Sequence, residues 1–424
     1  MLSREENELL TRTGPGTAMG DLLRRYWVPA ILASELPEPD GDPVRITLLG
    51  ESLVAFRDTD GRVGLLGALC PHRGAPLFFG RNEACGLRCI YHGWKFDVDG
   101  RCVELPNEPP ESTFAERVRH TAYPCVERSG VIWTYLGPPE RRPEPPALEW
   151  ALIAPEHLYV SKRWQECNYA QAMEGGIDSS HVSFLHGDRR ARGDTPSGRY
   201  MRDRAPRFEL VDTDYGFMIG ARRDAEEDSY YWRITPWLLP WYTVVPPYGD
   251  RPLVGHAWVP IDDENCWVVT ATWHPTRPLT EQERDEAEQG LTHHPRTIPG
   301  TFRPERNKSN DYLIDREAQR SGRSYSGIVG ISEQDTAVQE GMGPIFDRTR
   351  ERLGASDSAI VQMRRRLLRA ARDLRKGVEP PALDPNAFRV RSVSIVLPRQ
   401  GAAWPEAAAE AMRAVPDAFF ASVP

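Results

Sequence analysis

The chain has 424 residues, of which 27% are charged and 40% hydrophobic, a composition typical of a globular protein with two or three domains. Its net charge of −8 argues against a protein that binds nucleic acid. The first residues contain no apolar signal core, and no apolar run approaches the roughly 18 residues of a membrane-spanning helix. We therefore expect neither a nucleic-acid partner nor a membrane-embedded segment.

Two regions are predicted before the first dense run of prolines. Residues 1–39 are expected to form an N-terminal helical segment. Residues 43–66 then show the pattern of three short strands, separated by Gly50 and by the turn at 58–61. Because further strand patterns follow, residues 40–137 are predicted to form a small antiparallel β domain.

Two motifs in this β domain each pair one cysteine with one histidine: Cys70-Pro-His72 and Cys89-Ile-Tyr-His92. Two thiolates on one iron and two imidazoles on the other are the ligands of a Rieske [2Fe–2S] cluster. A glycine follows each histidine within two residues, so each loop can turn back through positive φ. Tetrahedral zinc also accepts two cysteines and two histidines, but the spacing is not that of a usual zinc finger. The other five cysteines show no paired spacing, which with a cluster indicates a reducing, cytoplasmic compartment.

Proline density marks a boundary after the β domain. The segment 138–146 is predicted to be an interdomain linker, with a long surface loop inside one domain as the alternative. Residues 147–424 are expected to form a larger catalytic domain, an antiparallel sheet covered by helices, so the whole chain is α+β. Its helices are predicted at 169–185 and at 332–376, the second with a break near Gly354. Its strands are predicted at 159–164, 217–222, 230–235, 242–245, 266–273 and 389–397.

A second set of ligands is predicted at the end of the helix 169–185. Asp178 and His181 are three residues apart, so a helix places them on one face. His186 lies five residues after His181, so both imidazoles reach one metal only if the helix ends or widens there. Two histidines and a carboxylate with open positions form the facial triad of non-haem Fe(II).

Asp335 is the candidate for that carboxylate. It shares a helical stripe with Ile331, Val338 and Met342, so it is expected to point inward, where an unpaired charge is costly and a metal would satisfy it. The two glutamates of this segment lie off the stripe and are expected to be solvated: Glu333 and Glu340. The remaining histidines are expected to be structural or at the surface: His120, His157, His256, His274, His293 and His294.

Taken together, these motifs resemble the Rieske non-haem iron ring-hydroxylating oxygenases, α subunit, and most of all their phthalate dioxygenase-like branch. The resemblance runs from residues 14–27 to residues 343–348 and includes Gln334-Asp335. It implies a homotrimer or a hexamer of stacked trimers, in which the cluster of one subunit faces the iron of its neighbour. Asp178 would then link a cluster histidine, His72 or His92, to His181 across the interface.

One position departs from the family pattern, and the sequence contains no recognisable motif for binding a nicotinamide or flavin cofactor. Family members often carry Glu-Asn-x2-Asp where this chain has Gly175, which supplies no side-chain amide, so no role is carried over to it. No Gly-x-Gly-x2-Gly follows a predicted strand. A separate NAD(P)H-dependent reductase, with or without a ferredoxin domain, is therefore expected to supply the electrons.

Arg233 is the candidate substrate-binding residue, because it alternates within a predicted strand and arginine binds carboxylates through two parallel hydrogen bonds. A surface or salt-bridged arginine is the alternative, and Arg222 and Arg189 are weaker candidates. The predicted reaction is dihydroxylation of an aromatic acid such as a phthalate with O2. Oxidative O-demethylation of a methoxylated aromatic acid is the alternative within the class. A Rieske electron-transfer protein and a zinc hydrolase are the alternatives from other classes.

Overall fold

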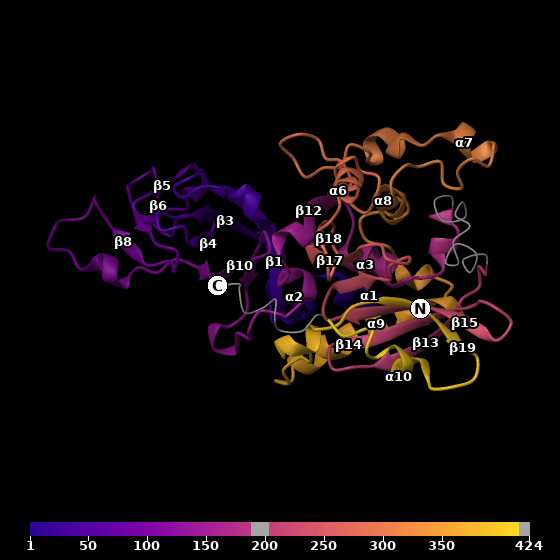
Figure 1. The fold of residues 1–424 in the computed structure, drawn as a ribbon. Helices are drawn as coiled ribbons and strands as arrows, with labels where there is room; N and C mark the ends of the chain where they lie inside the picture. Colours follow the sequence, from indigo (N-terminus) through magenta and orange to yellow (C-terminus); the bar gives the residue numbers. More distant parts are fainter. Residues whose placement is uncertain (188–202, 415–424) are drawn as a thin grey trace.

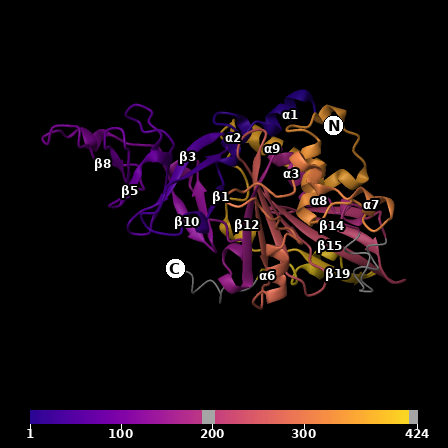
Figure 2. The same ribbon diagram turned by 90° about the horizontal axis from the view of Figure 1, so that it is seen from above.

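The computed structural model describes residues 1–187 and 203–414. Two parts lie side by side in both views: a β-rich part formed by the earlier segments, and a larger sheet with its helices (Figure 1; Figure 2). The predicted α+β architecture, a small antiparallel β domain followed by a larger sheet with helices, is confirmed. Among the helices of the described ranges, none combines the length and the apolar composition that crossing a bilayer requires.

Two helices and a strand begin the chain: α1 (Arg4–Thr11), α2 (Ala18–Leu23) and β1 (Trp27–Leu32). Both helices pack against α9 (Ser358–Leu374), which comes from the far end of the sequence. β1 pairs with β11 (Val131–Tyr135), which also pairs with β10 (Cys125–Arg128), in a three-stranded sheet. The segment predicted to be helical therefore also supplies a strand next to the β domain.

The β-rich part contains two further four-stranded sheets. The three strands predicted within residues 43–66 are confirmed as β2 (Val44–Leu48), β3 (Glu51–Arg57) and β4 (Val63–Gly67), with β9 (Ala122–Tyr123) beside β4. The second sheet consists of β5 (Arg81–Glu83), β6 (Gly86–Arg88), β7 (Lys95–Phe96) and β8 (Cys102–Glu104). One cysteine–histidine loop follows β4 and the other joins β6 to β7, so both motifs lie next to regular structure.

An eight-stranded antiparallel sheet forms the base of the larger part, within the described ranges. Its order is β12-β18-β17-β16-β15-β14-β13, and β19 pairs with β15. The six strands predicted here are confirmed, and β13 and β17 are additional. The bounds are β12 (Leu158–Gln165), β13 (Arg207–Asp212), β14 (Gly216–Asp224), β15 (Ser229–Leu238), β16 (Tyr242–Val245), β17 (Leu253–Pro260), β18 (Cys266–Trp273) and β19 (Val393–Pro398).

The helix predicted over 169–185 is shorter in the structure. α3 (Tyr169–Ile177) begins where the side chain of Asn168 accepts a hydrogen bond from the backbone of Ala170. It ends at Asp178, whose backbone is extended and whose Oδ1 accepts from the Ser180 N–H at 2.7 Å. This local hydrogen bond replaces the next helical one. The predicted extension to residue 185 is therefore wrong.

The helix predicted over 332–376 is two helices, α8 (Ile331–Gly341) and α9, with residues 342–357 between them. Gly343 has a φ of +91° and precedes a proline, which disfavours helical backbone at the residue before it. The predicted break is therefore a longer connection, which contains two short 3-10 helices, Arg348–Arg350 and Ala355–Asp357. Within the described ranges, three shorter α-helices also belong to the larger part: α6 (Glu281–Glu288), α7 (Arg316–Arg320) and α10 (Trp404–Ala408).

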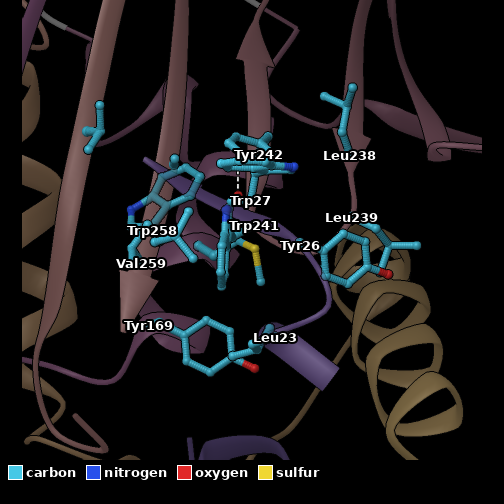
Figure 3. Packing of buried hydrophobic residues seen from close by; sticks show 14 of the residues in the cluster. Leu23, Tyr26, Trp27, Tyr169, Leu238, Leu239, Trp241, Tyr242, Trp258 and Val259 are labelled. Atoms are coloured by element: carbon cyan, nitrogen blue, oxygen red, sulfur yellow. Dashed lines mark hydrogen bonds between the residues drawn. The ribbon is translucent and has the colours of Figure 1, made fainter. Parts of the chain in front are cut away.

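A core of aromatic side chains fixes the position of α3 (Figure 3). The hydroxyl of Tyr242 on β16 donates to the backbone carbonyl of Trp27 on β1 at 3.0 Å. The hydroxyl of Tyr169 on α3 donates to the carbonyl of Leu10 on α1 at 3.1 Å. Large aromatic groups contribute much of the free energy of burial, and here each hydroxyl also has a partner. The core thus joins the N-terminal helices, the sheet and α3.

Candidate metal centres and active-site cavity

The two cysteine–histidine loops have the same backbone hydrogen bonds. In each loop, the N–H of Cys70 or Cys89 donates to the carbonyl five residues later at 2.8 Å. Gly74 and Gly93, each four residues after its cysteine, donate back to the cysteine carbonyl at 2.9 and 3.0 Å. Their φ angles of +73° and +80° lie in the left-handed region, which explains the glycine in both loops. The sequence therefore builds one loop geometry twice.

The loops bring the four predicted cluster ligands together. The ring centroids of His72 and His92 are 4.5 Å apart, and Trp94 stacks on His72 at 4.4 Å with an interplanar angle of 5°. Both thiols are buried, and burial together with the nearby Cys89 thiol raises the pKa of Cys70 to about 11. The Nδ1 atom of His92 is buried and has no hydrogen-bond partner in residues 1–187 and 203–414. Such groups fit a cluster, which would bind the thiolates and this nitrogen.

A single zinc ion does not fit these four residues. A tetrahedral zinc site brings its ligand atoms within about 4 Å of one another. Among the residues that the structure describes, no three of these four side chains offer ligand atoms within 4.8 Å of one another. The wider spacing agrees with ligands that are shared between two irons.

The second predicted set does converge on one point. The Nε2 atoms of His181 and His186 are 3.1 Å apart, and Asp335 Oδ1 lies 3.4 Å from the first and 3.1 Å from the second. Although burial opposes it, the neighbouring carboxylates raise the pKa of His181 to about 10. Burial also opposes the shift at Asp335, yet the two imidazoles hold its pKa well below the usual range. The site therefore favours a positive charge between these groups, as an Fe(II) facial triad requires.

Each histidine of the triad is oriented through its other ring nitrogen. Asp178 Oδ2 lies 3.3 Å from the Nδ1 of His181. Gln334 Oε1 lies 2.6 Å from the Nδ1 of His186. An acceptor at Nδ1 keeps the proton on that nitrogen and leaves Nε2 free to bind a metal. Because α3 ends at Ile177, Asp178 follows the helix and His181 begins a short 3-10 helix (His181–Ser183), so the two residues do not share the helix face that was predicted.

The predicted apolar stripe on α8 is wrong, although α8 does bring Asp335 to the histidines. Val338 and Met342 are 46% and 47% exposed, so that face of α8 points to solvent. The face that lines the site is polar and consists of Ser332, Asp335 and Gln339. The two glutamates expected in solvent are also placed differently: Glu333 is 2% exposed beside Arg306, and Glu340 accepts a hydrogen bond from Tyr312.

A cavity of about 60 Å³ lies beside the triad, and Arg233 on β15 lines it. Arg233 is 2% exposed, its Nη2 donates to the carbonyl of Pro246 at 2.8 Å, and its guanidinium lies 4.4 Å from the centre of the Tyr248 ring. Its buried Nη1 has no hydrogen-bond acceptor among the described residues. This arrangement differs from a surface or salt-bridged arginine. The weaker candidate Arg222 stacks over Tyr230 at 4.2 Å, away from this lining. Arg189 lies outside the described residues.

Sequence reasoning missed five residues of this site: Arg163, His256, His293, Gln334 and Gln339. His256, expected to be structural or at the surface, lies on β17 and lines the cavity, where burial and the nearby Arg163 lower its pKa to about 3. Its strand was not predicted, so the direction of its side chain was unknown. Gln334 directly precedes Asp335, and the resemblance of this pair of residues to the family was the signal that could have identified Gln334.

Comparisons with known proteins match both parts of the chain. Residues 26–123 match the Rieske [2Fe–2S] domain, and residues 134–411 match the LigXa C-terminal domain like family. The chain is 43% identical to the phthalate 4,5-dioxygenase oxygenase subunit of Pseudomonas putida, over 87% of this chain and 86% of that one. It is 39% identical to the 3-chlorobenzoate-3,4-dioxygenase oxygenase subunit of Comamonas testosteroni, over 91% and 92%.

One further relative and one solved structure are also similar to this chain. The 5,5'-dehydrodivanillate O-demethylase oxygenase subunit of Sphingobium sp. (strain NBRC 103272 / SYK-6) is 34% identical, over 90% of this chain and 84% of that one. A crystal structure of dicamba monooxygenase bound to dicamba shares the fold with a TM-score of 0.58 at 20% identity, over 84% of this chain and 99% of the other. The chain therefore belongs to the Rieske non-haem iron oxygenases, as an oxygenase subunit with a [2Fe–2S] cluster and a mononuclear iron.

Proposed function

We propose that this oxygenase subunit inserts oxygen from O2 into an aromatic acid, with dihydroxylation of a phthalate-like ring as the reaction. Cys70, His72, Cys89 and His92 would hold the Rieske cluster. His181, His186 and Asp335 would hold the mononuclear Fe(II). The observation that carries the proposal is the convergence of these last three side chains, within 3.1–3.4 Å, beside a cavity that Arg233 lines.

The protein's own residues prepare this site. When bound, iron(II) supplies the activation of O2, with electrons that arrive through the cluster. Asp178 and Gln334 hold the two imidazoles by Nδ1, so their Nε2 atoms face one point. Buried walls around the triad, such as Trp258 and Val182, keep bulk water from the reacting groups.

Arg233 is the residue that we propose for carboxylate binding. Its buried Nη1 has no hydrogen-bond acceptor among the described residues, and a substrate carboxylate would supply one. Two of the relatives are named for phthalate and for 3-chlorobenzoate, which are both aromatic carboxylates. The O-demethylase relative supports demethylation of a methoxylated aromatic acid as the alternative. The match over residues 134–411 argues against a protein that only transfers electrons.

We also propose a homotrimer or hexamer that receives electrons from a separate NAD(P)H-dependent reductase. Within one chain, the cluster loops and the helices α3 and α8 lie in different parts of the molecule (Figure 1). Ile90 and Tyr91, inside the second cluster loop, are 61% and 55% exposed, as expected for a surface that a neighbouring subunit covers. Asp178 would there connect His181 to His72 or His92 of the next subunit.

Oxygen uptake tests the proposal. The purified protein with both iron centres is combined with a reductase, NADH and a panel of phthalates, chlorobenzoates and methoxybenzoates. We expect substrate-dependent uptake and a cis-dihydrodiol product from the phthalates, whereas formaldehyde from the methoxybenzoates would identify the demethylase. A loaded protein that consumes no more oxygen with any acid than without it contradicts the aromatic-acid assignment.

A further inference from the structure

Gly175 on α3 faces the side-chain amide of Gln339 on α8. A Cβ placed on Gly175 would lie 2.2 Å from the Nε2 of Gln339, and within 4 Å it would meet only atoms of that side chain. Both residues line the cavity beside the metal triad. Gln339 lies one helical turn after Asp335, so its side chain emerges on the same face of α8. The amide of Gln339 therefore fills the space that the absent side chain of residue 175 leaves.

Hydrogen bonds settle which end of this amide faces the cavity. Arg163 can only donate, and its Nη2 lies 3.3 Å from Gln165, so the oxygen of Gln165 must be the acceptor. The Nε2 of Gln165 then donates to the Oε1 of Gln339 at 2.6 Å. Because its oxygen is used in this way, Gln339 directs its NH2 group toward Gly175 and the cavity. This NH2 makes no hydrogen bond with any residue in the described ranges.

We propose that Gln339 is a substrate-binding residue, whose NH2 group donates a hydrogen bond to a second oxygen-bearing substituent of the aromatic acid. Gln339 is 5% exposed and its NH2 group borders the cavity, so a substrate oxygen at this point would accept a hydrogen bond that no described residue accepts. Arg233 on β15 and Gln339 on α8 both line the cavity, so one ring can present a substituent to each. The inference rests on the proposed function and adds selectivity for a disubstituted ring.

The binding experiment uses holoenzyme with phthalate, which has two carboxylates, and with benzoate, which has one. We expect Q339L to weaken phthalate binding about tenfold, the loss of one hydrogen bond to a charged acceptor, and to change benzoate binding little. Iron content and the visible spectrum of the cluster should stay as in the wild type. Equal losses for both acids, no loss for either, or loss of the mononuclear iron would overturn the proposal. If the wild type binds no aromatic acid, the proposed function itself is wrong.

A swap of the amide between the two helices tests the geometry in the same assay. G175A should weaken phthalate binding because its Cβ displaces the amide of Gln339, and G175N/Q339A should regain most of the lost affinity because it carries an amide into the same space. G176A is the matched control, since its Cβ would lie 2.1 Å from Trp258 and not near Gln339. Thermal unfolding gives a readout without substrate: Q339A should relieve the destabilisation caused by G175A but not that caused by G176A. Failure of Q339A to relieve G175A would contradict the packing on which the proposal stands.

Discussion

The two histidines of the triad are oriented by acceptors of different charge. His181 faces the carboxylate of Asp178, whereas His186 faces the neutral amide of Gln334. A carboxylate acceptor makes the imidazole a stronger metal ligand than an amide does. Metal binding by each histidine therefore depends on the one acceptor at its Nδ1 atom, and single substitutions can test it.

Replacing Asp335 should empty the mononuclear site and leave the cluster in place. D335A removes the only carboxylate of the triad, so we expect loss of one iron per chain and of oxygenase activity, with the visible spectrum of the cluster retained. Iron analysis and absorbance measure the two effects. V338A on the exposed face of α8 is the control and should keep the iron. Retained iron and activity in D335A would mean that another group is the third ligand.

Replacing Gln334 should weaken the metal without changing its ligands. Q334A leaves the Nδ1 of His186 without its acceptor, and we expect a loss of about 10- to 100-fold in Fe(II) or Co(II) affinity, as for other residues that orient metal-bound histidines. Q334E restores an acceptor and should recover the affinity. A chelator competition on protein with an intact cluster measures this. Unchanged affinity in Q334A would show that packing alone orients His186.

At the scale of elements, the sequence predicted those whose patterns are local. Six strands of the large sheet and the three strands in residues 43–66 follow from alternation and turn residues. The edge strand β13 alternates polar and apolar residues over Arg207-Phe208-Glu209-Leu210, so its pattern was present in the sequence and was not recognised. β17 contains Gly255 and ends at Pro260, two residues that are unfavourable in strands, which weakened its signal. The inward face of α8 could not be predicted, because a metal and a cavity demand polar residues where packing would demand apolar ones.

An ion pair connects β12 to the turn after β1. Lys162 on β12 is almost fully buried, with its Nζ 2.5 Å from the Oε1 of Glu35. Burial lowers the pKa of Lys162, and Glu35 opposes that effect. E35A leaves the buried ammonium without its carboxylate, so we expect a loss of about 3–5 kcal/mol and a lower Tm.

Thermal unfolding of the cluster-loaded protein measures this change. E8A is the control, because it removes the exposed pair between Glu8 and Arg12, which should contribute less than about 1 kcal/mol. The double variant E35A/K162M, which removes the charge as well, should be more stable than E35A alone. A Tm in E35A equal to that of E8A would show that Lys162 finds other compensation.

At the scale of the whole molecule, the strands β5 and β8 of the cluster domain lie apart from the helices α3 and α8 that lead to the triad (Figure 2). This separation within one chain is expected if electrons pass between subunits. Complementation tests this arrangement. C89A lacks a cluster ligand and D335A lacks an iron ligand, so each homo-oligomer should be inactive. Co-expressed chains should recover activity in mixed assemblies, because an intact cluster then faces an intact iron. Mixed assemblies that form but stay inactive would mean that electrons pass within one chain.

The contact between Gly175 and Gln339 also constrains the order in which this site can evolve. A side chain at position 175 meets the long amide of residue 339, so it becomes acceptable only after residue 339 has been shortened. The reverse order passes through a protein with a clash in the wall of its active site. Among descendants of this chain, a side chain at position 175 should therefore appear only after residue 339 has changed to a shorter one.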